Sequence, residues 1–178
     1  MSRIEIDDKQ LIVLSENKTS YKYSSILEFQ KNSNKNLGIA ILYSNYNLSI
    51  NKSLVNGFLN ELSDKNYNGN IAYLEVPGGA FEIPVFCKSI INKHRPLIVL
   101  TVGCIIKGDT KHYDFLSSSV TNALMNLSVE TNTPILNGIL TVEYNSQAIE
   151  RAGSKLNKGK EFADAALKIL NFSQYFNE

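Results

Sequence analysis

Four largely apolar segments of strand length alternate with segments of helical periodicity, and this alternation restricts the possible folds more than any other feature. The apolar segments are residues 37–43, 71–76, 97–102 and 134–141. Apolar spacings of three and four mark helical faces within residues 55–62, 83–91, 116–127 and 162–169. Strands that lack polar alternation are buried on both faces. We therefore predict an α/β/α sandwich with a four-stranded parallel sheet.

The first 36 residues depart from this pattern. Residues 9–14 are compatible with a short strand, whereas residues 15–25 are polar and residues 30–36 contain only Lys, Asn, Ser and Gln. This composition fits an extension that becomes ordered on a partner, for example by adding a strand to a neighbouring subunit. It also fits a disordered tail. The predicted organisation is an N-terminal extension, 1–36, followed by one domain, 37–178.

Composition argues against several classes of protein. The formal net charge of +1 gives no reason to expect binding to nucleic acid or an anionic membrane. Cys87 and Cys104 lie in apolar runs, which suits buried side chains better than a disulfide framework, and no zinc-ligand spacing is present. No apolar run approaches the roughly 18–20 residues of a membrane span. The start of the chain lacks a signal peptide's apolar segment, so we expect a cytoplasmic protein.

Residues that neither helices nor strands explain follow three of the predicted strands. They form the loops 44–47, 77–84 and 103–114. The carboxyl ends of parallel strands meet at one edge of a sheet, and ligands of open α/β proteins bind there. The three loops therefore predict a single binding site on one rim.

The third loop has features of a phosphate-binding loop. Gly103 and Gly108 have the spacing of a Walker A motif, but Asp109 occupies the position of the required lysine. This substitution argues against a nucleoside-triphosphatase. The amides of Asp109 and Thr110, at the start of a helix, instead suit a single phosphate group. A tight turn without a ligand is the alternative.

His112 begins the helix that follows this loop. Histidine exchanges protons near neutral pH, and Asp114 or a backbone carbonyl could orient its ring. His112 is therefore the candidate for proton transfer, with an ordinary surface histidine as the alternative. His94 is expected at a helix end on the opposite rim, as a solvated or capping residue.

The second loop combines two glycines with an aromatic ring and a carboxylate. Gly78 and Gly79 permit positive φ and close backbone approach. A planar heterocycle could stack on Phe81 and donate hydrogen bonds to Glu82. The alternative is a core phenylalanine beside a carboxylate that interacts with the helix dipole. Tyr46, after the first strand, offers either a second aromatic surface or a packing contact.

Two cations further along the chain are candidates for anion binding. Arg151 lies at a helix end before a glycine, where a guanidinium can bind phosphate through two parallel hydrogen bonds. Lys158 lies in an Asn-Lys-Gly sequence. Ordinary exposed charges are the alternative, and the residues alone do not decide between the two.

Four stretches together resemble the lumazine synthase family over about residues 37–170. They are Pro-Gly-Gly-Ala-Phe-Glu-Ile-Pro at 77–84, Gly-Asp-Thr-Lys-His-Tyr-Asp at 108–114, Gly-Ile-Leu-Thr at 138–141 and Gln-Ala-Ile-Glu-Arg-Ala-Gly at 147–153. The resemblance implies a flavodoxin-like subunit with active sites between neighbours in a pentameric ring. It also implies condensation of 5-amino-6-(D-ribitylamino)uracil with 3,4-dihydroxy-2-butanone 4-phosphate, which releases phosphate and water and needs no metal or organic cofactor.

The resemblance further implies roles for individual residues. His112 would transfer protons and Arg151 would bind the phosphate. The other implied roles are a phosphate-facing loop of Gly108, Asp109 and Thr110, an aromatic stack on Tyr46, contacts to the pyrimidine and ribityl chain from Ala80, Phe81 and Glu82, backbone contacts from Ile105 and Ile106, and a substrate-binding lysine at Lys158. Asn137 stands where many relatives carry an aromatic residue that closes the adjacent subunit's pocket, and Asn45 replaces a common arginine.

Assembly and function each have alternatives. The short link between Gly153 and Lys158 favours a closed shell of twelve pentamers over a free pentamer. One rival function is an archaeal-type riboflavin synthase, which dismutates lumazine. Another is a binding or shell protein that has lost the chemistry. A flavodoxin-like electron carrier would need neither His112 nor Arg151.

Overall fold

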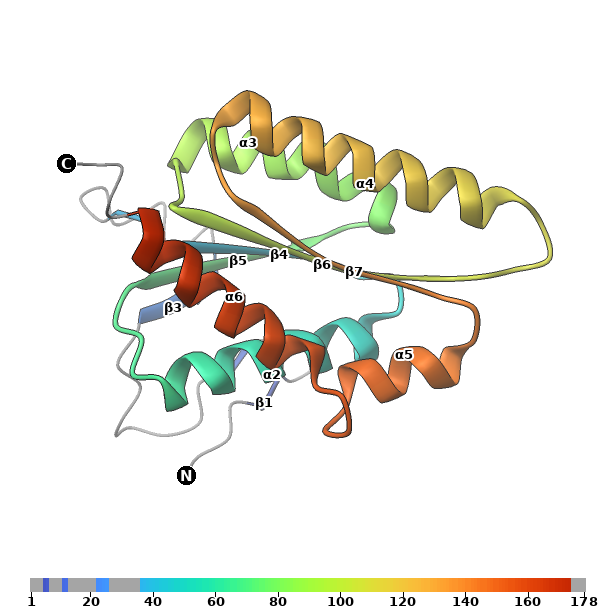
Figure 1. The fold of residues 1–178 in the computed structure, drawn as a ribbon, viewed down its shortest axis with the longest axis horizontal. Helices are drawn as coiled ribbons and strands as arrows, with labels where there is room; N and C mark the ends of the chain where they lie inside the picture. Colours follow the sequence, from blue (N-terminus) through green and yellow to red (C-terminus); the bar gives the residue numbers. More distant parts are fainter. Residues whose placement is uncertain (1–4, 7–10, 13–21, 26–35, 174–178) are drawn as a thin grey trace.

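The computed structural model describes residues 5–6, 11–12, 22–25 and 36–173. From residue 36 onward, strands and helices alternate as predicted. A central sheet lies between two layers of helices (Figure 1). The predicted α/β/α sandwich is confirmed.

The central sheet contains five parallel strands in the order β3-β5-β4-β6-β7. Their bounds are Lys22–Ser25 (β3), Ile39–Ser44 (β4), Asn70–Val76 (β5), Ile98–Ile106 (β6) and Ile135–Val142 (β7). The last four are the predicted strands, and their spatial order, second-first-third-fourth, is that of flavodoxin-like folds. The connection that follows β4 leads to β5 on one side of it, and the connection that follows β5 leads to β6 on the other side. The topological switch point therefore lies between β4 and β6.

The fifth strand, β3, comes from the N-terminal extension and pairs with β5 of its own chain. Its polar sequence carries no hydrophobic strand signal, because backbone pairing at a sheet edge requires no apolar side chains. Two further strands, β1 (Glu5–Ile6) and β2 (Leu11–Ile12), pair antiparallel. β2 falls within the predicted strand at 9–14, whose other residues lie outside the described part of the chain, as do residues 30–35.

β6 is longer than predicted. We expected this strand to end at Val102 and residues 103–106 to belong to a loop, and this expectation is wrong. These residues continue the strand and pair with β7 as far as the partners Ile106 and Val142. The backbone hydrogen bonds of the β7 ladder outweigh the low strand propensity of Gly103. The third candidate loop therefore begins at Lys107.

Helices α2, α5 and α6 cover one face of the sheet, and α3 and α4 cover the other (Figure 1). Their bounds are Leu48–Asp64 (α2), Ile83–His94 (α3), His112–Thr131 (α4), Asn145–Ala152 (α5) and Lys158–Ser173 (α6), with the short helix η1 at Ala80–Glu82. His94 ends α3 on the rim opposite the candidate loops, as predicted. Among the described residues, no helix combines the length and apolarity needed to cross a membrane.

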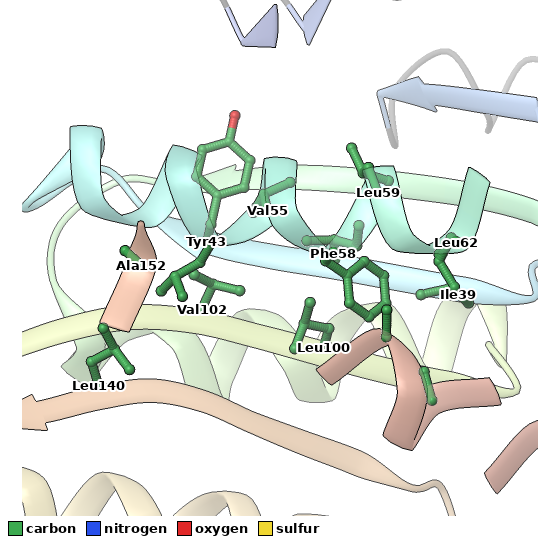
Figure 2. Close-up of a cluster of buried hydrophobic side chains, with 14 of the residues drawn as sticks. Ile39, Tyr43, Val55, Phe58, Leu59, Leu62, Leu100, Val102, Leu140 and Ala152 are labelled. Atoms are coloured by element: carbon green, nitrogen blue, oxygen red, sulfur yellow. The ribbon is translucent and has the colours of Figure 1, made fainter. Parts of the chain in front are cut away.

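Each face of the sheet buries its own apolar cluster. On one face, α2 packs its predicted apolar stripe, including Val55 and Phe58, against sheet residues such as Leu100 (Figure 2). On the other face, α3 and α4 bury Val99, the neighbour of Leu100 on β6. Consecutive strand residues thus enter opposite cores, which explains why the strands read as continuous apolar runs. The candidate loops follow directly on the carboxyl ends of these buried strands.

Candidate active site

A cavity of about 590 Å³ opens at the carboxyl rim, beside the switch point between β4 and β6. Its wall comes from the three candidate loops, the end of β6 and the first turns of α4. The lining residues are Tyr46, Gly79, Ala80, Phe81, Glu82, Cys104, Ile105, Ile106, Gly108, Thr110, His112, Tyr113 and Leu116. The fold therefore brings most of the predicted site residues together in one place.

Tyr46 presents an exposed ring on a firmly held backbone. Its side chain is 69% exposed and lines the cavity. The Tyr46 N–H donates to the Gly78 carbonyl oxygen at 3.2 Å, which joins the first loop to the second. The Tyr46 carbonyl oxygen accepts hydrogen bonds from Asn51 Nδ2 at 2.9 Å and from Ser44 Oγ at 3.2 Å. An accessible ring held in this way offers a stacking surface for a planar ligand.

The second loop turns sharply into η1 and α3. Gly78 has φ 100°, in the left-handed region that favours glycine, as its sequence context suggested. The Gly79 N–H donates to Glu82 Oε2 at 2.7 Å, so one carboxylate oxygen stabilises the turn itself. Phe81 is 66% exposed and lines the cavity, so it is not the core residue that the alternative interpretation required.

The third loop delivers a helix N-terminus and a histidine to the cavity. His112 is the first residue of α4, is exposed, and donates its N–H to Thr110 Oγ1 at 3.4 Å. The 20-residue helix directs its positive end towards this rim, which favours an anion. Gly108 has no positive φ, and a Cβ atom there would meet nothing within 4 Å. Neither the turn nor packing within the subunit therefore requires glycine at this position.

Cys104 also lines the cavity, but its thiol is not a nucleophile at neutral pH. Burial raises the pKa of Cys104 to about 11 and that of Cys87 to about 12. Both cysteines are free and buried, as predicted, and both thiols stay protonated under ordinary conditions. The main-chain carbonyl of Cys104 accepts a hydrogen bond from Asn47 Nδ2 at 2.9 Å.

Four predicted site residues are absent from the cavity wall: Asp109, Asn137, Arg151 and Lys158. Asp109 is exposed between two lining residues. Arg151, on α5, donates from Nη1 to the Gln147 carbonyl oxygen of its own helix at 3.2 Å. Lys158 begins α6, where its Nζ lies 2.6 Å from Glu161 Oε2. Helices α5 and α6 belong to the layer on the far side of the sheet from α4 (Figure 1).

Asn137 lies on β7, the edge strand nearest α4. Its Oδ1 accepts a hydrogen bond from the Ile139 N–H at 3.1 Å, and its side chain is exposed. A side chain at the next residue, Gly138, would meet Phe162 of α6, so Asn137 projects from the opposite face, where α4 packs. One subunit therefore carries two groups of predicted site residues. The cavity set comprises those that line the cavity: Tyr46, Ala80, Phe81, Glu82, Ile105, Ile106, Gly108, Thr110 and His112. The outlying set comprises Asn137, Arg151 and Lys158.

Sequence reasoning predicted no ligand contact for four cavity residues: Gly79, Cys104, Tyr113 and Leu116. Gly79 was singled out only as a glycine that permits close backbone approach. Leu116 lies four residues after His112, a spacing that places both on one side of α4, but it was interpreted only as part of the apolar stripe. Cys104 was interpreted as a small buried side chain, which is correct, although it also contributes to the wall. Tyr113 carries no separate sequence signal.

A parallel sheet of flavodoxin-like order, with a cavity beside its switch point, defines a ligand-binding α/β protein of the flavodoxin-like class. Residues 36–174 match the family model described as 6,7-dimethyl-8-ribityllumazine synthase. The 6,7-dimethyl-8-ribityllumazine synthase of Buchnera aphidicola subsp. Baizongia pistaciae is 43% identical over 136 residues, which cover 75% of this chain and 85% of that protein. The chain belongs to the 6,7-dimethyl-8-ribityllumazine synthase family, a family of transferases in riboflavin biosynthesis.

Proposed function

We propose that this chain condenses 5-amino-6-(D-ribitylamino)uracil with 3,4-dihydroxy-2-butanone 4-phosphate, forming 6,7-dimethyl-8-ribityllumazine and releasing phosphate and water. The single observation that carries this proposal is the composition of the cavity. One space of about 590 Å³ contains a histidine, a helix N-terminus and two exposed aromatic rings. This volume falls in the ordinary range of small-molecule sites.

The chemistry requires several proton transfers, and His112 is the group that supplies them. The substrate amine attacks the ketone, and the imine forms with loss of water. Phosphate then leaves, and the second nitrogen closes the ring with loss of another water. His112 accepts and returns protons during these steps. Because both reacting groups belong to the substrates, holding them in register provides much of the acceleration.

The two aromatic rings and the end of β6 would hold the pyrimidine. Tyr46 and Phe81 offer faces for stacking, and both side chains are about two-thirds exposed. Backbone groups of Ile105 and Ile106 lie at the cavity wall, where they can pair with the edge of the heterocycle. Glu82 retains one carboxylate oxygen beyond the bond to Gly79, and this oxygen would accept from a ligand N–H or hydroxyl.

The departing phosphate would lie at the N-terminus of α4. The amides of Asp109 and Thr110 and the open space beside Gly108 suit an anion that approaches the backbone closely. The lining residues of the cavity include no Lys or Arg within the described part of the chain. A phosphate dianion in this space therefore needs a cation from elsewhere, and Arg151 is our candidate.

We further propose that a neighbouring copy of the chain supplies this cation together with Asn137 and Lys158. The outlying set is accessible at the surface of one subunit but belongs to other elements than the cavity. Exposed apolar side chains on α4, including Phe115, Met125 and Val129, support association with other copies. We propose a pentameric ring, and the short link between Gly153 and Lys158 favours a closed shell of twelve such rings.

The test is an assay with both substrates that follows lumazine fluorescence. We expect product from the wild-type chain, a rate roughly a hundredfold lower for His112→Ala, and a rate within about twofold of wild type for His94→Ala. His94 is the matched control because it is the other histidine and lies on the opposite rim.

Two other outcomes would contradict the proposal. An inactive wild-type chain that still binds lumazine would indicate a binding or shell protein. Riboflavin formed from lumazine alone would indicate a riboflavin synthase.

A further inference from the structure

A buried amide on α2 holds the first loop, and none of the roles above uses it. Asn51 is fully buried, with 0% exposure. Its Nδ2 lies 2.8 Å from the Ser44 carbonyl oxygen and 3.0 Å from Ser44 Oγ. The same nitrogen lies 2.9 Å from the carbonyl oxygen of Tyr46. One side chain thus donates to both ends of the segment that carries the exposed ring.

Packing of α2 does not explain an asparagine at this position. Asparagine is a poor residue for a helix interior, and its Oδ1 finds no donor among the residues that the structure describes. A buried amide with an unpaired oxygen is unfavourable compared with an apolar residue of the same shape. Side chains on a helix lean towards its N-terminus, and this brings the Asn51 amide over the loop that precedes α2. The position of Asn51 therefore serves the loop and not the core.

The backbone of Tyr46 is held from two independent directions. Asn51 and Ser44 Oγ donate to its carbonyl oxygen, and its own N–H donates to the Gly78 carbonyl oxygen of the second loop. A residue with both main-chain polar atoms bonded has little freedom to rotate, although its ring is 69% exposed. The Tyr46 ring is thus fixed at its base relative to the loop that carries Phe81.

We propose that Asn51 is a positioning residue that sets the orientation of the Tyr46 ring for a planar ligand. This inference rests on the proposed stacking role of Tyr46. Loss of the Asn51 donors would leave the fold in place, because they contact only the last residue of β4 and the loop after it, and Asn51 belongs to neither apolar cluster. It would free the Tyr46 carbonyl and allow the ring to move, which weakens binding of any ligand that stacks on it.

The chain contains no tryptophan, and this allows a clean test. Tyr46→Trp places a single tryptophan, which can be excited selectively, on the first loop. In this background, Asn51→Leu keeps the approximate volume and removes both donors, and Asn51→Ser is the second variant should the leucine chain fail to fold. Val55→Ala is the matched control, because Val55 is also buried on α2 but contacts the core. Time-resolved anisotropy without ligand reports local motion, and tryptophan quenching by 6,7-dimethyl-8-ribityllumazine reports the Kd.

We expect the fast component of the anisotropy decay to grow roughly twofold, and the Kd to rise about tenfold, in the Asn51 variants but not in Val55→Ala. Equal behaviour of the Asn51 variants and Val55→Ala would overturn the proposal. If neither the wild-type chain nor the Tyr46→Trp chain binds lumazine while the anisotropy still depends on Asn51, the proposed function fails and the positioning of the loop stands.

Discussion

The cavity set and the outlying set are organised in opposite ways within one subunit. The cavity set is gathered at the carboxyl ends of β4, β5 and β6 and at the start of α4. The outlying residues Asn137, Arg151 and Lys158 come from an edge strand and from two helices of the far layer. The loops after β4, β5 and β6 meet at one cavity on the carboxyl rim, whereas Asn137 lies within a strand and Arg151 and Lys158 lie on helices on the other side of the sheet from α4.

The difference separates two kinds of contribution to the site. One subunit provides the shape, the aromatic surfaces and the proposed proton-transfer group, His112. The two cations proposed to bind the substrate phosphate remain outside the cavity wall, with Arg151 bonded to its own helix backbone and Lys158 paired with Glu161. If the proposed assembly is correct, association of subunits turns a binding pocket into an active site. Three predictions sharpen or break this comparison.

Arg151→Ala is expected to have the largest effect, a loss of kcat/KM of roughly a hundredfold, because the departing phosphate loses a bidentate cation. Arg151→Lys should recover only part of the rate, since an ammonium cannot donate two parallel hydrogen bonds. The control is Lys155→Ala, which removes an exposed cation paired with Glu150 from the same region and should leave the rate near that of wild type. Steady-state kinetics with both substrates measure each effect. Wild-type rates for Arg151→Ala would show that the outlying set takes no part.

Substitutions at two glycines, Gly159 and Gly108, distinguish a role in helix packing from a role in the proposed site. A methyl group at Gly159 would collide with the Leu54 carbonyl oxygen and lie 2.8 Å from the Phe58 nitrogen, where α6 crosses α2. Gly159→Ala should therefore lower the free energy of unfolding by about 1–3 kcal/mol. Gly108→Ala should change it by less than about 0.5 kcal/mol, because its methyl group meets no protein atom.

Denaturant unfolding measures both free energies. Gly108→Ala should instead raise KM for the phosphate-bearing substrate, since the methyl group occupies the space proposed for the anion. An unstable Gly108→Ala chain would contradict the packing argument, and unchanged kinetics would remove Gly108 from the proposed site.

Asn137→Phe is expected to give a smaller effect on ligand recognition than Arg151→Ala, and it is the only substitution expected to give a gain. A phenyl ring on the α4 side of β7 would add a stacking surface to the pocket of an adjacent subunit, which is worth about tenfold in pyrimidine affinity. The Asn137 hydrogen bond to the Ile139 N–H is lost, but it lies at an exposed edge and contributes little. Titration with 6,7-dimethyl-8-ribityllumazine measures the Kd. An unchanged or higher Kd would show that Asn137 lies away from the ligand.

Hydrophobic patterning predicted those parts of the fold that apolar burial controls. The stripe that contains Phe58 and the continuous apolar run of β4 allowed only a sheet covered on both faces. Hydrophobic patterning failed to predict strands that form because their backbone hydrogen-bonds to a neighbouring strand. β3 is polar yet extends the sheet, and β6 continues through Gly103 because β7 lies beside it.

The candidate site likewise contains residues that the sequence predicted and residues that it did not. Loop position and residue chemistry singled out His112 and Tyr46, since both follow strands at the ligand-binding rim. The polar support of Tyr46 by Asn51 was not predicted, because an isolated asparagine within a helical pattern gives no signal of what its amide contacts. The roles of Arg151 and Lys158 came from family resemblance, and one subunit does not bring either residue to the cavity.

The most direct test of a site shared between subunits is activity in mixtures of two inactive variants. His112→Ala lacks the proposed proton-transfer group of the cavity set, and Arg151→Ala lacks the proposed phosphate-binding cation of the outlying set. Co-assembly of equal amounts should restore about one quarter of wild-type activity, because in a random mixture that fraction of interfaces pairs an intact cavity set with an intact outlying set. Activity that stays at the level of the separate variants, despite mixed assembly confirmed by affinity tags, would contradict the account.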